Sequence, residues 1–165
     1  MRRLPFALLA GALLWPAFPG HDLWWLAPIG VAVLAVATAG AGPWRAAALG
    51  LVTGLVFFGA TLQWSGSYLG YLPWFGLSAL EALYAAGLGL LTGWLQRDGR
   101  IRPLAVALAW VAQEAARSRT PYGGFPWVRL AFSQADAPTA RLAAIGGAPL
   151  VTFAVALAGG LLAAA

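Results

Sequence analysis

The sequence predicts an all-α protein, a multi-pass transmembrane helix bundle with about six membrane segments. Of its 165 residues, 61% are hydrophobic and only 9% are charged. A soluble domain carries about 25% charged residues, so this chain has too few to cover a surface in water. The apolar residues also come in long blocks separated by short turns, which indicates that lipid surrounds the protein.

Six apolar blocks define the expected membrane segments. A helix crosses the hydrocarbon layer with about 20 residues, so the second, third, fourth and sixth blocks are near the required length. The first and fifth are short and need flanking residues to reach the interface. The last block ends without a polar or aromatic flank, so we expect it to be truncated. The blocks cover residues 4–18, 24–41, 46–64, 73–95, 104–116 and 149–165.

Short polar or proline-containing turns separate these blocks. Arg2 and Arg3 precede the first block, and His21-Asp22 lies before the second. Pro43-Trp44-Arg45 precedes the third block, a Ser-, Gly- and Tyr-containing loop at 65–72 precedes the fourth, and a charged turn at 96–102 precedes the fifth. Eight of the nine tryptophans lie at or near block ends, where amphipathic rings prefer the membrane interface. Their placement supports the same boundaries.

The arginines predict the orientation in the membrane, because short cytoplasmic loops carry an excess of basic residues. The N-terminus, Arg45 and the 96–102 turn are then cytoplasmic, and the segment 117–147 is extracytoplasmic. That last segment holds four arginines and one acid, Asp136, against the usual tendency. We expect its arginines to bind phosphates at the outer leaflet or to pair with Glu114 and Asp136.

Two glutamates lie inside apolar blocks, where an ionised side chain is costly unless it is paired or faces water. Glu114 and Arg117 are three residues apart on one helix face and can pair, as a polar pocket or as a structural ion pair. Glu81 has no base at helical spacing. It is expected to be protonated, to bond Gln63 or Tyr84, or to point into a cavity.

The run Gly123-Gly124-Phe125-Pro126-Trp127 predicts a tight, rigid turn after the fifth block. Glycine supplies backbone freedom, and proline restricts the residue before it to extended geometry. Two interpretations stay open, a simple re-entry turn and a wall for lipid chains or headgroups.

The composition offers no catalytic set, metal site or cofactor motif. The chain has no Cys, so a disulfide and a thiolate site are excluded. Its single histidine, His21, lies beside a turn and the sequence has no nucleophile elbow, so no Ser-His-Asp arrangement is visible. No phosphate loop or GxGxxG motif is present. The arginines lie at segment ends and form no basic stripe, so we expect no nucleic-acid partner.

The chain resembles the N-terminal membrane part of the apolipoprotein N-acyltransferases. The early Trp15–Pro19 and Trp24–Pro28 turns resemble the first hairpin of that family, and Gly50–Gly54 with Gln63-Trp64 resembles its glycine-rich third helix. The most distinctive similarity runs from Trp110 through Glu114 to Arg117, then Gly124-Phe125-Pro126-Trp127 and Phe132-Ser133-Gln134, with Gly146-Gly147 and Val151-Thr152-Phe153 in register.

The resemblance implies transfer of an acyl chain from a phospholipid to the N-terminal amine of a diacylglyceryl-cysteine lipoprotein, in a bacterial inner membrane. In that family a Glu, a Lys and a Cys of an extracytoplasmic nitrilase-like domain carry the chemistry. This chain contains no Cys and no Lys, so no catalytic residue is assigned and the chain alone is expected to be inactive. The candidate substrate- or lipid-facing residues are Glu114, Arg117, Gly124, Phe125, Pro126, Trp127 and Gln134, with Glu81 and Gln63 as intramembrane polar residues.

Two other functions remain in competition. A small transporter or channel subunit would line its path with Glu81, Gln63, Glu114 and Arg117, which would then converge on one cavity through the bundle. A purely structural bundle would need only the packing glycines of the third and fourth blocks.

Overall fold

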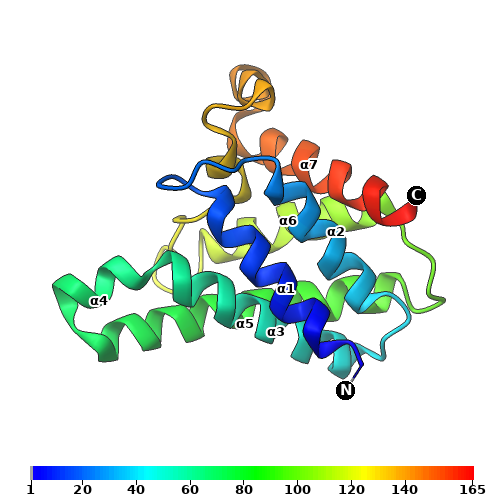
Figure 1. Ribbon diagram of the computed structural model, residues 1–165, viewed down its shortest axis with the longest axis horizontal. Coiled ribbons are helices and arrows are strands. Elements are labelled where there is room, and N and C mark those ends of the chain that lie inside the picture. The colour runs from blue at the N-terminus through cyan, green and yellow to red at the C-terminus, as the bar shows by residue number, and fades with distance from the viewer. Residues whose placement is uncertain (1) are drawn as a thin grey trace.

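The computed structural model describes residues 2–165, and its regular secondary structure within those residues is entirely helical (Figure 1). This confirms the all-α expectation. Three helical stretches are long and apolar enough to cross a membrane, Pro43–Thr61, Tyr71–Leu95 and Pro138–Ala164, and two shorter apolar stretches are Leu4–Ala17 and Leu26–Thr38.

The first half of the chain forms three helices that pack on one another. The sequence favours their starts, since Pro5 and Pro43 occupy opening turns, where the missing proline N–H costs nothing. For that reason the third helix begins at Pro43, three residues before the apolar block. The elements are α1 (Leu4–Leu14), the 3₁₀ turn η1 (Trp15–Ala17), α2 (Leu26–Thr38) and α3 (Pro43–Thr61).

The expected loop at residues 65–72 is wrong, because most of it is helical. Helix α4 covers Gln63–Leu69, and helix α5 covers Tyr71–Leu95. The chain reverses at Gly70 alone, whose φ of +88° suits glycine. The Ser and Gly residues that suggested a loop are tolerated in a short helix, and the Ser65 hydroxyl donates to the Leu62 carbonyl at 2.7 Å. The result is the α4–α5 hairpin that projects at the left of Figure 1.

The second half of the chain contains two helices joined by a long irregular segment. Helix α6 covers Pro103–Arg117 and α7 covers Ala143–Ala164, with the 3₁₀ turns η2 (Leu130–Gln134) and η3 (Pro138–Leu142) between them. Helix α7 is interrupted at Gly146 and Gly147, which have non-helical backbone angles. Its straight part therefore begins close to Pro149, where the apolar block begins.

Helices α3 and α5 form the closest helix pair (Figure 1). A Cβ at Gly50 would lie 2.2 Å from the Ala85 carbonyl oxygen, and a Cβ at Gly89 would lie 2.2 Å from the Ala46 oxygen. Small residues allow such backbone contact between membrane helices. Gly87, on another face of α5, has no such neighbour within 4 Å, so the glycines of α5 are not equivalent.

The turns segregate to two ends of the bundle. At one end the Gly40 N–H donates to the Gln96 carbonyl at 2.8 Å, and the Arg3 guanidinium donates to the Ala37 carbonyl at 3.1 Å. At the other end the Gln134 amide reaches the Trp24 carbonyl at 3.2 Å. Arginines 2, 3, 45, 97, 100 and 102 therefore share the first end, and residues 118–142 lie at the second.

We predict that Gly89→Ala destabilises the protein by about 1–3 kcal/mol, because the new methyl group overlaps backbone and pushes α3 away from α5. The free energy of unfolding in mixed micelles measures this effect. Gly87→Ala is the matched control in the same helix, and its methyl group meets open space. Equal stability of the two variants would contradict the close packing of α3 on α5.

Candidate functional site

The buried centre of the candidate site is the Arg117 side chain, at the last residue of α6. Its guanidinium forms an ion pair with Glu81 of α5, with 2.7 Å between Nη1 and Oε2, and both side chains are 1% exposed. The guanidinium carbon lies 5.3 Å from the centre of the Phe58 ring of α3, close enough for a cation–π contact. Arg117 thus joins three helices at one point.

The same guanidinium also holds the loop that follows α6. It donates hydrogen bonds to the carbonyl oxygens of Phe125, Trp127 and Val128. Val128 is buried and has a φ of +56°, a backbone conformation that β-branched residues rarely adopt. Arg117 therefore stabilises a strained turn as well as neutralising a buried acid.

Glycine is required in this turn at position 124. Its φ is +76°, and a Cβ there would lie 2.2 Å from the Ser118 carbonyl carbon and 2.5 Å from the Arg117 oxygen. The close approach lets the Phe125 N–H donate to the Arg117 carbonyl at 3.0 Å, which satisfies an end carbonyl of α6. The sequence prediction of a tight glycine turn agrees with this geometry.

The expected Glu114–Arg117 pair does not form. Glu114 is buried, but its carboxylate accepts hydrogen bonds from the Leu130 N–H at 2.6 Å and from the Thr152 hydroxyl at 2.8 Å. Spacing along one helix showed that Glu114 and Arg117 could meet, whereas the fold offers each a better partner on another element. Glu114 consequently ties α6 to η2 and α7.

The expected partners of Glu81 are wrong for the same reason. Gln63 is exposed on α4, and the Tyr84 hydroxyl contacts the Thr120 carbonyl and hydroxyl at 2.6 and 2.8 Å. The partner of Glu81 is 36 residues away in sequence, a separation that helical spacing alone does not reveal. No local signal in the sequence identifies that contact.

Gln134 is buried and holds the 3₁₀ turns against the first hairpin. Its amide donates to the Trp24 carbonyl at 3.2 Å and the Ser133 hydroxyl at 2.8 Å, and its oxygen accepts from the Thr139 hydroxyl at 2.7 Å. The candidate residues Glu81, Glu114, Arg117 and Gln134 therefore act as internal connections, because each forms hydrogen bonds to groups on other elements.

An aromatic cavity of about 560 Å³ lies outside this network, beside the loop. Trp127 is 53% exposed and lines it, whereas Pro126 is exposed next to it and Phe125 turns partly inward. The Trp64 and Trp127 ring centres are 6.3 Å apart. The lining residues are Phe18, Pro19, Thr61, Trp64, Trp127, Val128 and Phe132.

Sequence reasoning named only Trp127 among the candidate residues that line this cavity. In the sequence, Trp64 is one of the tryptophans at block ends and Phe132 belongs to the Phe132-Ser133-Gln134 motif. No sequence pattern indicates that these two side chains lie close together. Trp64 lies in the first turn of α4 and Phe132 lies in η2, and both line the cavity because the loop folds back over the helices. Thr152, the partner of Glu114, was missed likewise, although it lies in the Val151-Thr152-Phe153 motif.

Comparison with known proteins is consistent with this architecture. Residues 10–161 match the family model described as apolipoprotein N-acyltransferase N-terminal domain. Proteins named apolipoprotein N-acyltransferase are similar to 94% of the chain, at 33% identity in Pseudomonas syringae pv. tomato, 35% in Pseudomonas putida and 39% in Mycolicibacterium smegmatis. The match covers 33%, 33% and 26% of those proteins, so the chain spans about a third of the length of the curated relatives or less.

We predict that Arg117→Met lowers the free energy of unfolding by about 3–5 kcal/mol, because it leaves Glu81 buried without its partner. Protease sensitivity of residues 118–130 should rise with it, since three loop carbonyls lose their donor. Arg119→Met is the control, because the exposed Arg119 side chain donates only to the Ala115 carbonyl. If both variants have the stability of the unmodified protein, Arg117 does not hold the loop.

Proposed function

Because this chain belongs to the apolipoprotein N-acyltransferase family, matching its N-terminal domain, we propose that it forms the membrane portion of such an enzyme. That enzyme transfers an acyl chain from a phospholipid donor to the N-terminal amine of a diacylglyceryl-cysteine lipoprotein. The 165 residues contain no Cys and no Lys, so the thiol and amine chemistry of acyl transfer comes from outside them. Their own task is to hold and shape the lipid-binding face.

The aromatic cavity is the observation that carries this proposal. Its volume of about 560 Å³ falls within the roughly 300–1,000 Å³ of small-molecule sites. None of its seven lining residues is charged, and six of them are aromatic or aliphatic, namely Phe18, Pro19, Trp64, Trp127, Val128 and Phe132. Such a surface suits an acyl chain, since it offers apolar contact and no ionic partner. It is the part of the candidate region that remains open, because the buried polar candidates Glu81, Glu114, Arg117 and Gln134 form hydrogen bonds within the protein.

The Arg117 network supports a positioning role for the helices. Trp127 and Val128 line the cavity, and their carbonyl oxygens accept hydrogen bonds from the Arg117 guanidinium. The cavity wall therefore rests directly on the buried ion pair with Glu81. Among the residues that the sequence suggested as lipid-facing, Trp127 forms part of the cavity wall. Arg117 does not line the cavity but holds the carbonyls of the loop that forms the wall.

We place the protein in a bacterial inner membrane with its N-terminus in the cytoplasm and residues 117–147 outside. The arrangement of the turns supports this placement, since six of the ten arginines share one end of the bundle and the aromatic cavity lies at the other. Short basic loops stay in the cytoplasm. The cavity then faces the extracytoplasmic side, where the lipoprotein acceptor would arrive.

The geometry does not favour a transporter or channel. Glu114 and Arg117, the ion-pair partner of Glu81, line an internal cavity of only about 20 Å³. That volume holds about one water molecule. Gln63 lies apart on the exposed face of α4. A path for a solute would need these residues to line a continuous opening. Glu81 and Arg117 instead bond to each other, and Glu114 accepts hydrogen bonds from Leu130 and Thr152.

We predict that the isolated chain transfers no acyl group from phospholipid to a synthetic diacylated lipopeptide, because it has no thiol to accept the acyl chain. Mass spectrometry of the lipopeptide measures the product. The Pseudomonas putida relative is the positive control in the same lipid. Formation of a triacylated product by the isolated chain would refute the division of labour that we propose.

The cavity can be tested in a chimera in which this chain replaces the matching N-terminal part of the Pseudomonas putida relative. We expect Trp127→Ala in the chimera to lower kcat/KM about tenfold, because about 1.5–3 kcal/mol of apolar contact is available from one large side chain. Trp44→Ala is the control, since Trp44 is 80% exposed and sits at the arginine end. Equal kcat/KM for both variants would favour the purely structural bundle.

A further inference from the structure

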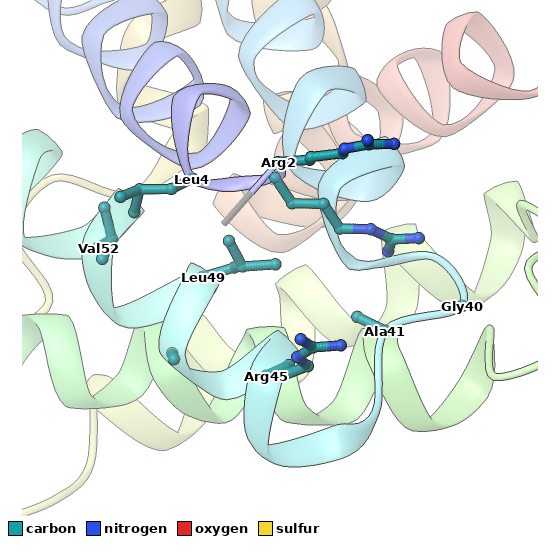
Figure 2. Close-up of a pocket in the computed structure, with 9 residues that line it drawn as sticks. Arg2, Leu4, Gly40, Ala41, Arg45, Leu49 and Val52 are labelled. Atoms are coloured by element: carbon teal, nitrogen blue, oxygen red, sulfur yellow. The ribbon is translucent and has the colours of Figure 1, made fainter.

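A second large cavity lies at the opposite end of the bundle from the aromatic one. Its volume is about 450 Å³, and it lies between the start of α1, the α2–α3 turn and the first turns of α3. Figure 2 shows the side chains of Arg2 and Arg45 with the apolar side chains of Leu4, Leu49 and Val52 around it. The third arginine of the lining is Arg3. Nothing in the proposed acyl-transfer role uses this cavity.

The charge of this cavity is not neutralised by the protein. Arg3 donates to the Ala37 and Ala39 carbonyls at the end of α2, which fixes its guanidinium at the rim. In the part of the chain that the structure describes, the ion pairs are Arg102–Asp98 and Arg117–Glu81, so no carboxylate pairs with Arg2, Arg3 or Arg45. The N-terminus of α3, with no side-chain cap, adds further positive potential beside Arg45.

The combination of three arginines with an aliphatic wall specifies an amphiphilic anion. Guanidinium groups bind phosphate oxygens in a bidentate manner, while Leu4, Leu49 and Val52 offer contact to hydrocarbon. A soluble phosphate would gain nothing from that wall. Basic pockets between helices at the cytoplasmic end of a membrane protein suit lipid headgroups.

We propose that this cavity is a binding site for a phospholipid with a net-anionic headgroup, distinct from the acyl donor site at the other end. The phosphodiester lies among Arg2, Arg3 and Arg45, and one acyl chain follows Leu4 toward Val52. A zwitterionic lipid fits less well, because its ammonium group would enter a region that already carries three positive charges. Bound lipid would brace α1 against α3 at the arginine end.

The competing explanation is general attraction of a basic protein end to anionic membranes. Arg97 and Arg100 provide the matched control, because they lie at the same end and are exposed but do not line the cavity. Each of two double variants removes two positive charges: Arg2→Gln/Arg45→Gln and Arg97→Gln/Arg100→Gln. Only the first pair removes them from the cavity.

The test is native mass spectrometry of the full chain in detergent, titrated with dioleoylphosphatidylglycerol or with dioleoylphosphatidylcholine. We expect a saturable single adduct with phosphatidylglycerol, weakened at least about tenfold in Arg2→Gln/Arg45→Gln and no more than about twofold in Arg97→Gln/Arg100→Gln. Equal weakening in both double variants, or equal binding of the two lipids, would overturn the proposal.

Two further measurements separate a built cavity from a charged surface. Ala48→Phe fills the cavity while leaving all three arginines in place, and we expect it to abolish the adduct without lowering the melting temperature of the lipid-free protein. Glycerol 3-phosphate, which has the phosphate without chains, should not raise the melting temperature at concentrations where phosphatidylglycerol does. Retention of the adduct in Ala48→Phe, or equal stabilisation by glycerol 3-phosphate, would show that no lipid site exists there.

Discussion

A guanidinium inside an apolar bundle needs acceptors for its N–H groups, and the two Nη atoms of Arg117 find them on two sides at once. One side is the Glu81 carboxylate on α5, and the other is a row of three carbonyls in the loop after α6. Because burying an unpaired charge in this environment is costly in free energy, loss of either set of contacts would destabilise the fold. The loop, the ends of two helices and the aromatic cavity wall all depend on this one side chain.

The need of buried polar groups for hydrogen-bond partners also explains why the residues that the sequence suggested as a lipid site are internal connections in the structure. Glu114, Gln134 and Thr152 use their polar atoms to connect α6, the 3₁₀ turns and α7. A bundle made largely of Ala, Leu, Gly and Val has little hydrophobic preference for one helix arrangement in lipid. Specific hydrogen bonds and close glycine contacts therefore decide which faces meet, and the open lining of the cavity is left to aromatic side chains.

The two cavities give the protein distinct chemical faces. One is aromatic and uncharged and is bounded by the Arg117-held loop, while the other is rimmed by Arg2, Arg3 and Arg45. The distribution of arginines along the chain produces this polarity, since successive turns alternate between the two ends. In the functions proposed above, the aromatic cavity binds an acyl chain and the arginine-rimmed cavity binds an anionic headgroup.

The helical class could be predicted from the amino-acid sequence alone, because hydropathy and proline placement act locally along the chain. The sequence also identified the residues of the unusual loop, since Gly124 is needed for a local backbone conformation. It did not reveal that Arg117 pairs with Glu81, that residues 63–69 are helical, or that Trp64 joins Trp127. Those features arise between elements that are distant in the chain, and the packing of the helices in three dimensions sets which partner a buried charge meets.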